Sequence, residues 1–211
     1  MAVIHRTTMV PTKRQLLTSW LPGRAWYRGG EPPDLRKAGG FRLDDPDGEV
    51  GIEFVVVTDH SGTQPYAYHV PLTYRGSPLP DAAEALVGTS EHGVLGTRWV
   101  YDATRDPVAV AQIVALLTGD ARPQAQSASD TPDPSVTVRS TDMLSPAAGF
   151  GPVRDGSSCT DIQVGDRIVR IHRLLRAPIS PAEQTGAGRV SAPWRLGDDV
   201  TVSGVLISVA A

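Results

Sequence analysis

Small polar residues gather at positions 156–160, with the sequence GSSCT, and they are the first group with a possible chemical use. Successive backbone N–H groups in such a turn can surround an anion, which makes Ser157 and Ser158 candidate ligands for a phosphate. The same composition is common in a hairpin turn between two strands, which needs no ligand. The sequence leaves both interpretations open, and the hairpin turn is the commoner outcome.

Glu91, His92, Asp102 and Asp106 form a second candidate group, because they combine an imidazole with three carboxylates. Acid–base catalysis would require them to lie within hydrogen-bond reach of one another. Asp102 and Asp106 flank an expected helix start, where carboxylates cap free N–H groups without any catalytic role. We therefore interpret both as caps, and His92 as a structural residue that bonds a backbone group.

A further pair of carboxylates, Glu49 and Glu53, is spaced for one face of a strand. Paired carboxylates are typical of glycosidases. These two alternate with Val50 and Ile52, however, and that pattern predicts that the glutamates face solvent. We expect no catalytic role for either.

Phosphoryl transfer needs a cation on the phosphates, carboxylates that hold Mg²⁺ and an aspartate that orients the acceptor. No lysine follows Lys37, so the phosphate loop GxxxxGK[ST] is absent. None of the five histidines is followed by the spaced Asp and Asn of a kinase catalytic loop. Ligand spacings such as HExxH and CxxC are also absent, and we expect no metal site.

Three tyrosines, Tyr66, Tyr68 and Tyr74, alternate along one expected strand and could form a sugar-stacking platform with Trp99. Alternating aromatic residues are equally typical of a half-buried strand that packs against a helix. Burial in a core is the commoner outcome for such residues, so we favour the core.

The composition is that of an ordinary globular chain. The chain has 211 residues, of which 40% are hydrophobic and 20% charged, and its net charge is −3. This small charge predicts neither nucleic-acid nor membrane-surface binding. No apolar run approaches the roughly 20 residues that cross a bilayer, and the first residues lack a signal-peptide core. With one cysteine, Cys159, no intrachain disulfide can form, and we expect a cytoplasmic protein.

Periodicity and capping predict the elements that position these residues. Apolar residues recur at helical spacing over 12–21 and 106–117, which begin with the capping residues Thr12 and Asp106. Gly119 follows the second helix, as is typical of a helix end. Alternating apolar residues predict strands over 41–43, 50–56, 66–74, 135–140, 160–164, 167–173 and 200–209.

Residues 120–134 contain no large apolar side chain, which predicts a solvated linker or a mobile loop. Residues 178–188 are expected to form a second flexible connection. The sequence thus predicts an α+β fold, with two antiparallel sheet units on either side of the linker.

Motifs such as HVPLTYR at 69–75 and RWVYDA at 98–103 resemble, in order, the N-terminal part of actinobacterial maltokinases and the related glucosamine kinases. The resemblance is carried by segments 5–13, 19–29, 41–46, 69–75, 98–103, 156–161, 165–173, 192–197 and 200–209.

This resemblance implies a cystatin-like cap, a helix on an antiparallel sheet, over residues 1–119, followed by the linker at 120–134. It implies a small kinase N-lobe-like β unit over 135–211 that stops at the interlobe hinge, before the lobe that holds the family's catalytic groups. The family's nucleotide-contacting lysine corresponds to Arg170. Arginine binds phosphate in a bidentate way, but its planar fork would not reproduce the placement of an ammonium group.

We therefore expect a non-catalytic accessory, regulatory or binding protein related to sugar kinases of glucan, trehalose or amino-sugar metabolism. Its partner would be a sugar kinase or a glucan- or trehalose-metabolising enzyme, and no cofactor is expected. One alternative is the N-terminal half of a split sugar kinase that uses ATP–Mg²⁺ and is completed by another chain. The other is a nucleotide or sugar sensor, with Arg170, Ser157 and Ser158 as nucleotide ligands.

Overall fold

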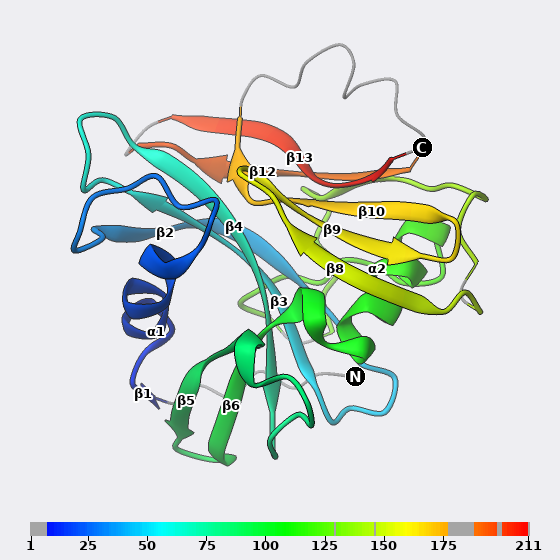
Figure 1. The fold of residues 1–211 in the computed structure, drawn as a ribbon, viewed down its shortest axis with the longest axis horizontal. Coiled ribbons are helices and arrows are strands. Elements are labelled where there is room, and N and C mark those ends of the chain that lie inside the picture. Colours follow the sequence, from blue (N-terminus) through cyan, green and yellow to red (C-terminus); the bar gives the residue numbers. More distant parts are fainter. Residues whose placement is uncertain (1–7, 129, 146, 177–187, 198–199, 211) are drawn as a thin grey trace.

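The structure is a computed structural model that describes residues 8–128, 130–145, 147–176, 188–197 and 200–210 (Figure 1). Antiparallel strands dominate it, and two short α-helices pack on them, which confirms the α+β class. The helices are α1 (Lys13–Trp20) and α2 (Pro107–Thr118), with the short 3-10 turns η1 (Leu21–Gly23), η2 (Ala83–Ala85) and η3 (Ala103–Arg105).

The strands are short at the edges of the sheet and long at its centre. In the first half they are β1 (Met9–Val10), β2 (Leu35–Leu43), β3 (Gly51–Asp59), β4 (Tyr66–Arg75), β5 (Leu86–His92) and β6 (Gly96–Asp102). In the second half they are β7 (Thr137–Arg139), β8 (Phe150–Asp155), β9 (Cys159–Val164), β10 (Arg167–His172), β11 (Leu174–Leu175), β12 (Arg189–Arg195) and β13 (Thr201–Ala210).

Six of these strands close into a ring that contains both halves of the chain. Neighbouring strands follow the order β4, β3, β2, β12, β13 and β10. The ring closes because β11, which follows β10 after Arg173, pairs with β4 through Leu174↔Tyr68 and Leu175↔Ala67. On its other side the two halves meet at one pair, Trp194↔Gly39, where β12 joins β2.

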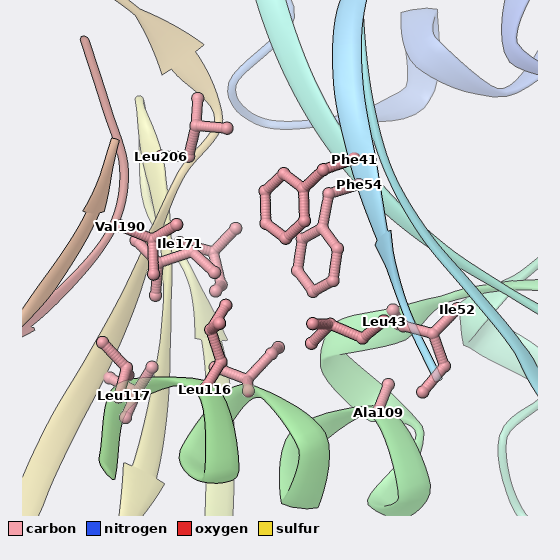
Figure 2. Packing of buried hydrophobic residues seen from close by; sticks show 14 of the residues in the cluster. Phe41, Leu43, Ile52, Phe54, Ala109, Leu116, Leu117, Ile171, Val190 and Leu206 are labelled. Atoms are coloured by element: carbon pink, nitrogen blue, oxygen red, sulfur yellow. The ribbon is translucent and has the colours of Figure 1, made fainter. Parts of the chain in front are cut away.

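The ring encloses the largest of three hydrophobic clusters of the described residues (Figure 2). Phe41 and Phe54 stack with ring centroids 4.4 Å apart and point toward strands of the second half. Helix α2 covers the same core with Leu116 and Leu117. Residues on both sides of the segment 120–134 therefore share one core, while the division into domains at that segment stays a prediction.

The second core lies on the opposite face of β3 and β4, where α1 packs (Figure 1). Leu17, Trp20 and Trp26 contribute from α1 and the turn after it, and Tyr68 and Val70 contribute from β4. Strands β3 and β4 are therefore covered on both faces, which explains why β3 is buried along almost its whole length.

Both helices begin at the capping residues that the sequence indicates. Thr12 caps α1 in a capping box with Gln15, and Asp106 caps α2 by accepting a bond from the Val108 N–H. Gly119 ends α2 in the left-handed conformation that glycine adopts without strain. The expected helices are confirmed within a residue or two.

The remaining expectations differ more from the structure. Residues 120–134 do not all lie away from the sheet, because Gln124 forms a β-bridge with Arg42 of β2. The sequence did not predict strands β5, β6 and β8. The expected connection at 178–188 lies outside the described residues except for Gly188. None of the helices described is both long enough and apolar enough to span a bilayer.

Candidate functional site

A polar pocket of about 400 Å³ opens where the first half of the chain meets the hairpin of β8 and β9. This volume falls in the range of roughly 300–1,000 Å³ that is usual for small-molecule sites. We call it the polar pocket; its lining residues are Trp20, Arg24, Glu84, Ala85, Asp102, Arg105 and Asp155. Five of these seven side chains carry a formal charge, so the pocket differs in character from an apolar groove.

A buried ion pair underlies the polar pocket. Arg173 is completely buried, and its Nη2 donates to both carboxylate oxygens of Asp102, at 2.8 and 2.6 Å. Asp102 also accepts bonds from the backbone N–H and the hydroxyl of Thr104. Arg173 Nη2 also donates to the Thr104 hydroxyl at 3.2 Å. These bonds hold the Asp102 carboxylate at the floor of the pocket in a single orientation.

The network continues to the opposite wall. Arg173 Nε donates to the Thr160 hydroxyl at 2.8 Å, and that hydroxyl donates to Asp155 Oδ1. The other oxygen of Asp155 accepts a long bond, 3.5 Å, from Arg105. Asp155 is therefore oriented by residues from both halves of the chain, while it still lines the pocket.

The third wall is a stack of cationic and aromatic groups. The Arg24 guanidinium lies 4.6 Å from the centroid of the Trp20 ring, Trp20 meets Trp26 edge to face, and Arg173 lies 5.1 Å from the Trp26 ring. Such contacts fix flat groups in place without saturating their N–H donors. Trp20 Nε1 and Arg24 Nε are buried and have no hydrogen-bond partner within the described chain.

The charges around the polar pocket balance. Arg24, Arg105 and the buried Arg173 supply three positive charges, and Glu84, Asp102 and Asp155 supply three negative ones. Within the described residues, no ion pair or hydrogen bond engages the Glu84 carboxylate. Because Trp20 Nε1 and Arg24 Nε are buried, the pocket offers the guanidinium groups of Arg24 and Arg105 as donors and a free carboxylate as acceptor, without a net charge that would select an ion.

Arg170, the candidate nucleotide ligand, lies on β10 outside this pocket. Its Nε and Nη2 each donate to one oxygen of Asp161 on β9, both at 2.7 Å, in a bidentate ion pair. That pair raises the pKa of Arg170 above its ordinary value. The side chain is 39% exposed, and Asp161 occupies the Nε–Nη2 edge of its guanidinium, one of the two edges that can bind a phosphate in a bidentate way.

Ser157 and Ser158 form the turn of the β8–β9 hairpin. The carbonyl of Ser157 accepts a bond from Arg28, and the carbonyl of Ser158 accepts bonds from the backbone N–H groups of Arg173 and Leu174. These contacts anchor the turn to the segment before β2 through Arg28, and to the junction of β10 and β11 through Arg173 and Leu174. The structure leaves the anion-binding role of the two serines as a prediction.

His92, Asp102 and Asp106 of the acid–base group identified in the sequence each accept hydrogen bonds from backbone N–H groups. His92 Nδ1 accepts bonds from the N–H groups of Val94 and Leu95, as expected for a residue that holds a backbone turn. Asp102 caps η3, and Asp106 caps α2. The expectation that the two aspartates serve as caps is confirmed, but their arginine partners had not been anticipated.

The expectation that Glu53 faces solvent is wrong. Glu53 is 9% exposed and forms an ion pair with Lys13 of α1, while Tyr74 and Gln126 donate to its two oxygens at 2.9 Å. Burial alone would raise the pKa of Glu53, but Lys13 and Tyr74 outweigh it and the pKa falls below its ordinary value. The strand is covered by α1 on that face, and strand alternation alone could not reveal this.

The tyrosines divide between core and surface. Tyr68 is fully buried in the second core, Tyr74 packs against that core, and Trp99 packs on a small cluster around Tyr101. Only Tyr66 is well exposed, and it lines an open, largely apolar groove of about 740 Å³ beside Trp194. The four residues therefore form no shared stacking platform.

Sequence reasoning missed the residue that organises the polar pocket. Arg173 was noted only as the end of an expected strand, and its partner Asp102 precedes it by 71 residues. The one available signal was that Trp20, Arg24 and Asp102 all fall in segments with a family resemblance. No group of three or more His, Cys, Asp or Glu side chains suited to a metal ion occurs among the residues described.

Comparison with known proteins supports the part of the family resemblance that concerns the N-terminal cap domain. No curated protein matches the chain. Six of the seven residues that line the polar pocket fall between positions 20 and 106. Over that range, residues 20–106, the chain matches the family model of the maltokinase N-terminal cap domain, and the resemblance to that cap domain is thereby confirmed.

Proposed function

We propose that this protein is a carbohydrate-binding accessory protein of glucan, trehalose or amino-sugar metabolism, and that a neutral sugar binds in the polar pocket. The observation that carries the proposal is that the Trp20 ring, the guanidinium groups of Arg24 and Arg105 and the free Glu84 carboxylate line one pocket. Sugar hydroxyls both donate and accept, so one ring can satisfy both kinds of group. The match to the maltokinase cap supports the metabolic setting.

Balanced charge favours a neutral ligand over a nucleotide. A triphosphate would bring several negative charges next to Glu84 and Asp155, which line the pocket. The bidentate Asp161–Arg170 pair also weighs against the nucleotide sensor.

Ion pairs that engage three other carboxylates support a binding role without phosphoryl transfer. Asp106 is held by Arg75, Glu53 by Lys13 and Asp102 by Arg173, so each already neutralises a cation of the fold. We propose that the protein acts by binding a sugar and docking on a sugar kinase or a glucan- or trehalose-metabolising enzyme. We propose that residues 1–119 correspond to a cystatin-like cap and residues 135–211 to a kinase N-lobe-like unit.

Thermal unfolding in the presence of maltose, trehalose, glucosamine, glucose or ATP–Mg²⁺ tests the proposal. A ligand at 100 times its dissociation constant adds about 2.7 kcal/mol, which for a chain of this size raises the Tm by roughly 5–10 °C. We expect at least one sugar to produce such a shift and ATP–Mg²⁺ to produce none. A shift with ATP–Mg²⁺ that the substitution Arg170→Gln abolishes would instead favour the nucleotide sensor.

Two variants locate the site. Glu84→Gln removes a carboxylate that has no partner in the described structure, so we expect unchanged folding and an affinity about ten- to hundredfold weaker. Glu49→Gln, at an exposed carboxylate outside the pocket, is the matched control and should leave the affinity unchanged. Equal affinities for the two variants would show that the sugar does not bind in this pocket. Transfer of phosphate from ATP to a sugar by the purified protein would contradict the non-catalytic role.

A further inference from the structure

A second, smaller pocket lies at the fork where β2 and β12 separate. The two strands share the pair Trp194↔Gly39, and beyond it a pocket of about 160 Å³ opens between their ends. We call it the cationic notch; its lining residues are Arg36, Lys37, Thr58, His60, Arg195 and Gly197. The volume is about five times the ~30 Å³ share of one water molecule, which is room for a small oxyanion.

Three formal positive charges converge on this notch. Arg36 and Lys37 come from β2 and Arg195 comes from the end of β12, so segments more than 150 residues apart supply them. Within the described residues, no ion pair or hydrogen bond engages the Arg195 guanidinium. Lys37 forms no ion pair with these residues, but its charge acts on the buried Glu53 carboxylate. Like charges that line one pocket repel one another, and an anion between them would relieve that repulsion.

The carboxylates near the notch do not neutralise it. Asp34 lies 3.5 Å from Arg36, but both side chains are more than half exposed, and exposed pairs of this kind are weak. Asp59 is buried, and its oxygens accept bonds from the Tyr27 hydroxyl and from the N–H groups of Asp34 and Ser61. Asp34 and Glu53 therefore offset part of the charge of Arg36 and Lys37, while Arg195 has no carboxylate partner among the described residues.

Polar groups at the back of the notch complete a site for an oxyanion. Thr58 is 3% exposed, and its hydroxyl lies 3.1 Å from His60 Nε2. The bond between them uses the hydrogen of one partner, so when the imidazole Nε2 donates it, the hydroxyl can donate one further hydrogen bond to a tetrahedral anion. Guanidinium groups suit such an anion because their planar forks bind its oxygens in a bidentate way.

We propose that the cationic notch binds a dianionic oxyanion, either inorganic phosphate or the phosphate group of a phosphorylated sugar. Arg36 and Arg195 hold the phosphate oxygens from opposite strands, and Lys37 adds a third charge. The site is separate from the polar pocket, with which it shares no lining residue, so it does not depend on sugar binding there. Because the anion bridges β2 and β12, its binding also stabilises the junction between the two halves of the chain.

Isothermal titration calorimetry at low salt tests this site with inorganic phosphate, glucose 1-phosphate and glucose. We expect phosphate and glucose 1-phosphate to bind and glucose not to bind at the notch. Tighter binding of glucose 1-phosphate than of phosphate would assign the site to phosphorylated sugars, and equal or tighter binding of phosphate would assign it to the free anion. Affinity should fall as salt is raised, because the attraction is electrostatic.

Charge-removing variants decide whether binding occurs in the notch. Arg36→Gln and Arg195→Gln should each weaken phosphate binding about ten- to hundredfold, while Arg14→Gln, on the exposed face of α1, should leave it unchanged. Circular dichroism melts confirm that each variant folds. Equal affinity in all three variants, or no binding by the unaltered protein, would overturn the proposal.

One further variant tests competition from the chain itself. Asp198 and Asp199 follow Gly197 in the sequence and lie outside the described residues. If phosphate bound only to the Asp198→Asn/Asp199→Asn variant, the chain's own carboxylates would occupy the notch and the proposal would fail. Binding by the unaltered protein that these two substitutions strengthen at most a few fold would support it.

Discussion

Arg173 Nη2 lies 2.8 and 2.6 Å from the two carboxylate oxygens of Asp102, and the arginine side chain is completely buried. Asp102 ends β6 in the part of the chain that matches the cap domain, and Arg173 joins β10 to β11, where the ring closes. One buried charge pair therefore couples the floor of the polar pocket to the closure of the ring. A change at either residue should affect both stability and ligand binding.

Asp102→Asn should destabilise the protein by about 3–5 kcal/mol, because it leaves the buried Arg173 guanidinium without a counter-charge. Urea denaturation measures the change as a lower midpoint at unchanged slope. Glu49→Gln, at an exposed carboxylate, is the control and should change the free energy of unfolding by less than about 0.5 kcal/mol.

Replacing both charges should cost less than the sum of the separate replacements. In Asp102→Leu/Arg173→Met no unpaired charge remains buried, so the double variant avoids most of the penalty of either single one. A double-mutant cycle by urea denaturation gives the coupling energy. Strict additivity would mean that the two residues contribute independently, which contradicts the geometry of the pair.

The polar pocket could not be read from the sequence, although the elements around it could. Helix α2 is signalled by Asp106, Pro107 and Gly119, which act within a few residues of one another. The pair Asp102–Arg173 spans 71 residues, and no local pattern connects its members. Such contacts depend on ring closure, which is a tertiary event.

Two of the errors in the strand predictions have the same origin. Glu53 alternates with apolar neighbours as a solvent-facing residue would, but α1 covers that face and supplies Lys13 as its partner. Strand β8 contains Gly151 and Pro152 and is exposed along most of its length, as an edge strand can be. Alternation is a reliable signal only for strands with one buried face, and neither strand is of that kind.

His69 should make stability fall in acid. This histidine is fully buried against Phe54, and burial with the nearby charge of Arg173 lowers its pKa from the ordinary 6.5 to about 3. The unfolded chain binds a proton below pH 6.5 that the folded chain resists, so the contribution is fully present above pH 6.5. It is lost as the pH falls toward 3, by at most about 1.4 kcal/mol per pH unit.

His69→Asn isolates this contribution. The asparagine amide can donate to the His172 carbonyl, as His69 Nδ1 does at 3.2 Å, but it does not titrate. Denaturant unfolding between pH 8 and pH 4 should show a shallower loss of stability for the variant, by roughly 2–3 kcal/mol between pH 6 and pH 4. Parallel curves for the two proteins would mean that His69 is protonated in the folded state in this range.

Asp106 combines two roles that two substitutions can separate. Its Oδ1 caps α2 through the Val108 N–H at 3.0 Å, and both of its oxygens accept from Arg75, at 2.6 and 2.7 Å. Asp106→Asn keeps the cap and removes the charge, so we expect a loss of about 1.5–3 kcal/mol. Asp106→Ala removes both and should cost about 1 kcal/mol more. Equal losses in chemical denaturation would show that the cap contributes nothing.

Gly39→Ala should weaken the junction between the two halves of the chain. Gly39 pairs with Trp194 at the only described contact between β2 and β12 in the strand ladder, and a Cβ there would lie 2.8 Å from the Pro193 carbonyl oxygen. Backbone on both sides of this contact is held by the ring, so the strands must separate and we expect a loss of about 1–3 kcal/mol.

The matched control for this junction is Gly23→Ala, since a Cβ at Gly23 meets nothing within 4 Å. Trp194 is 2% exposed and lies across the junction from Gly39, so the part of the four-tryptophan emission that the substitution Trp194→Phe removes reports separation of the strands. We expect Gly39→Ala to shift that emission to longer wavelength below the unfolding midpoint, and Gly23→Ala to leave it unchanged. If both variants unfolded at the same midpoint with the same emission, closure of the ring through β11 and β4 would hold the two halves together without this contact.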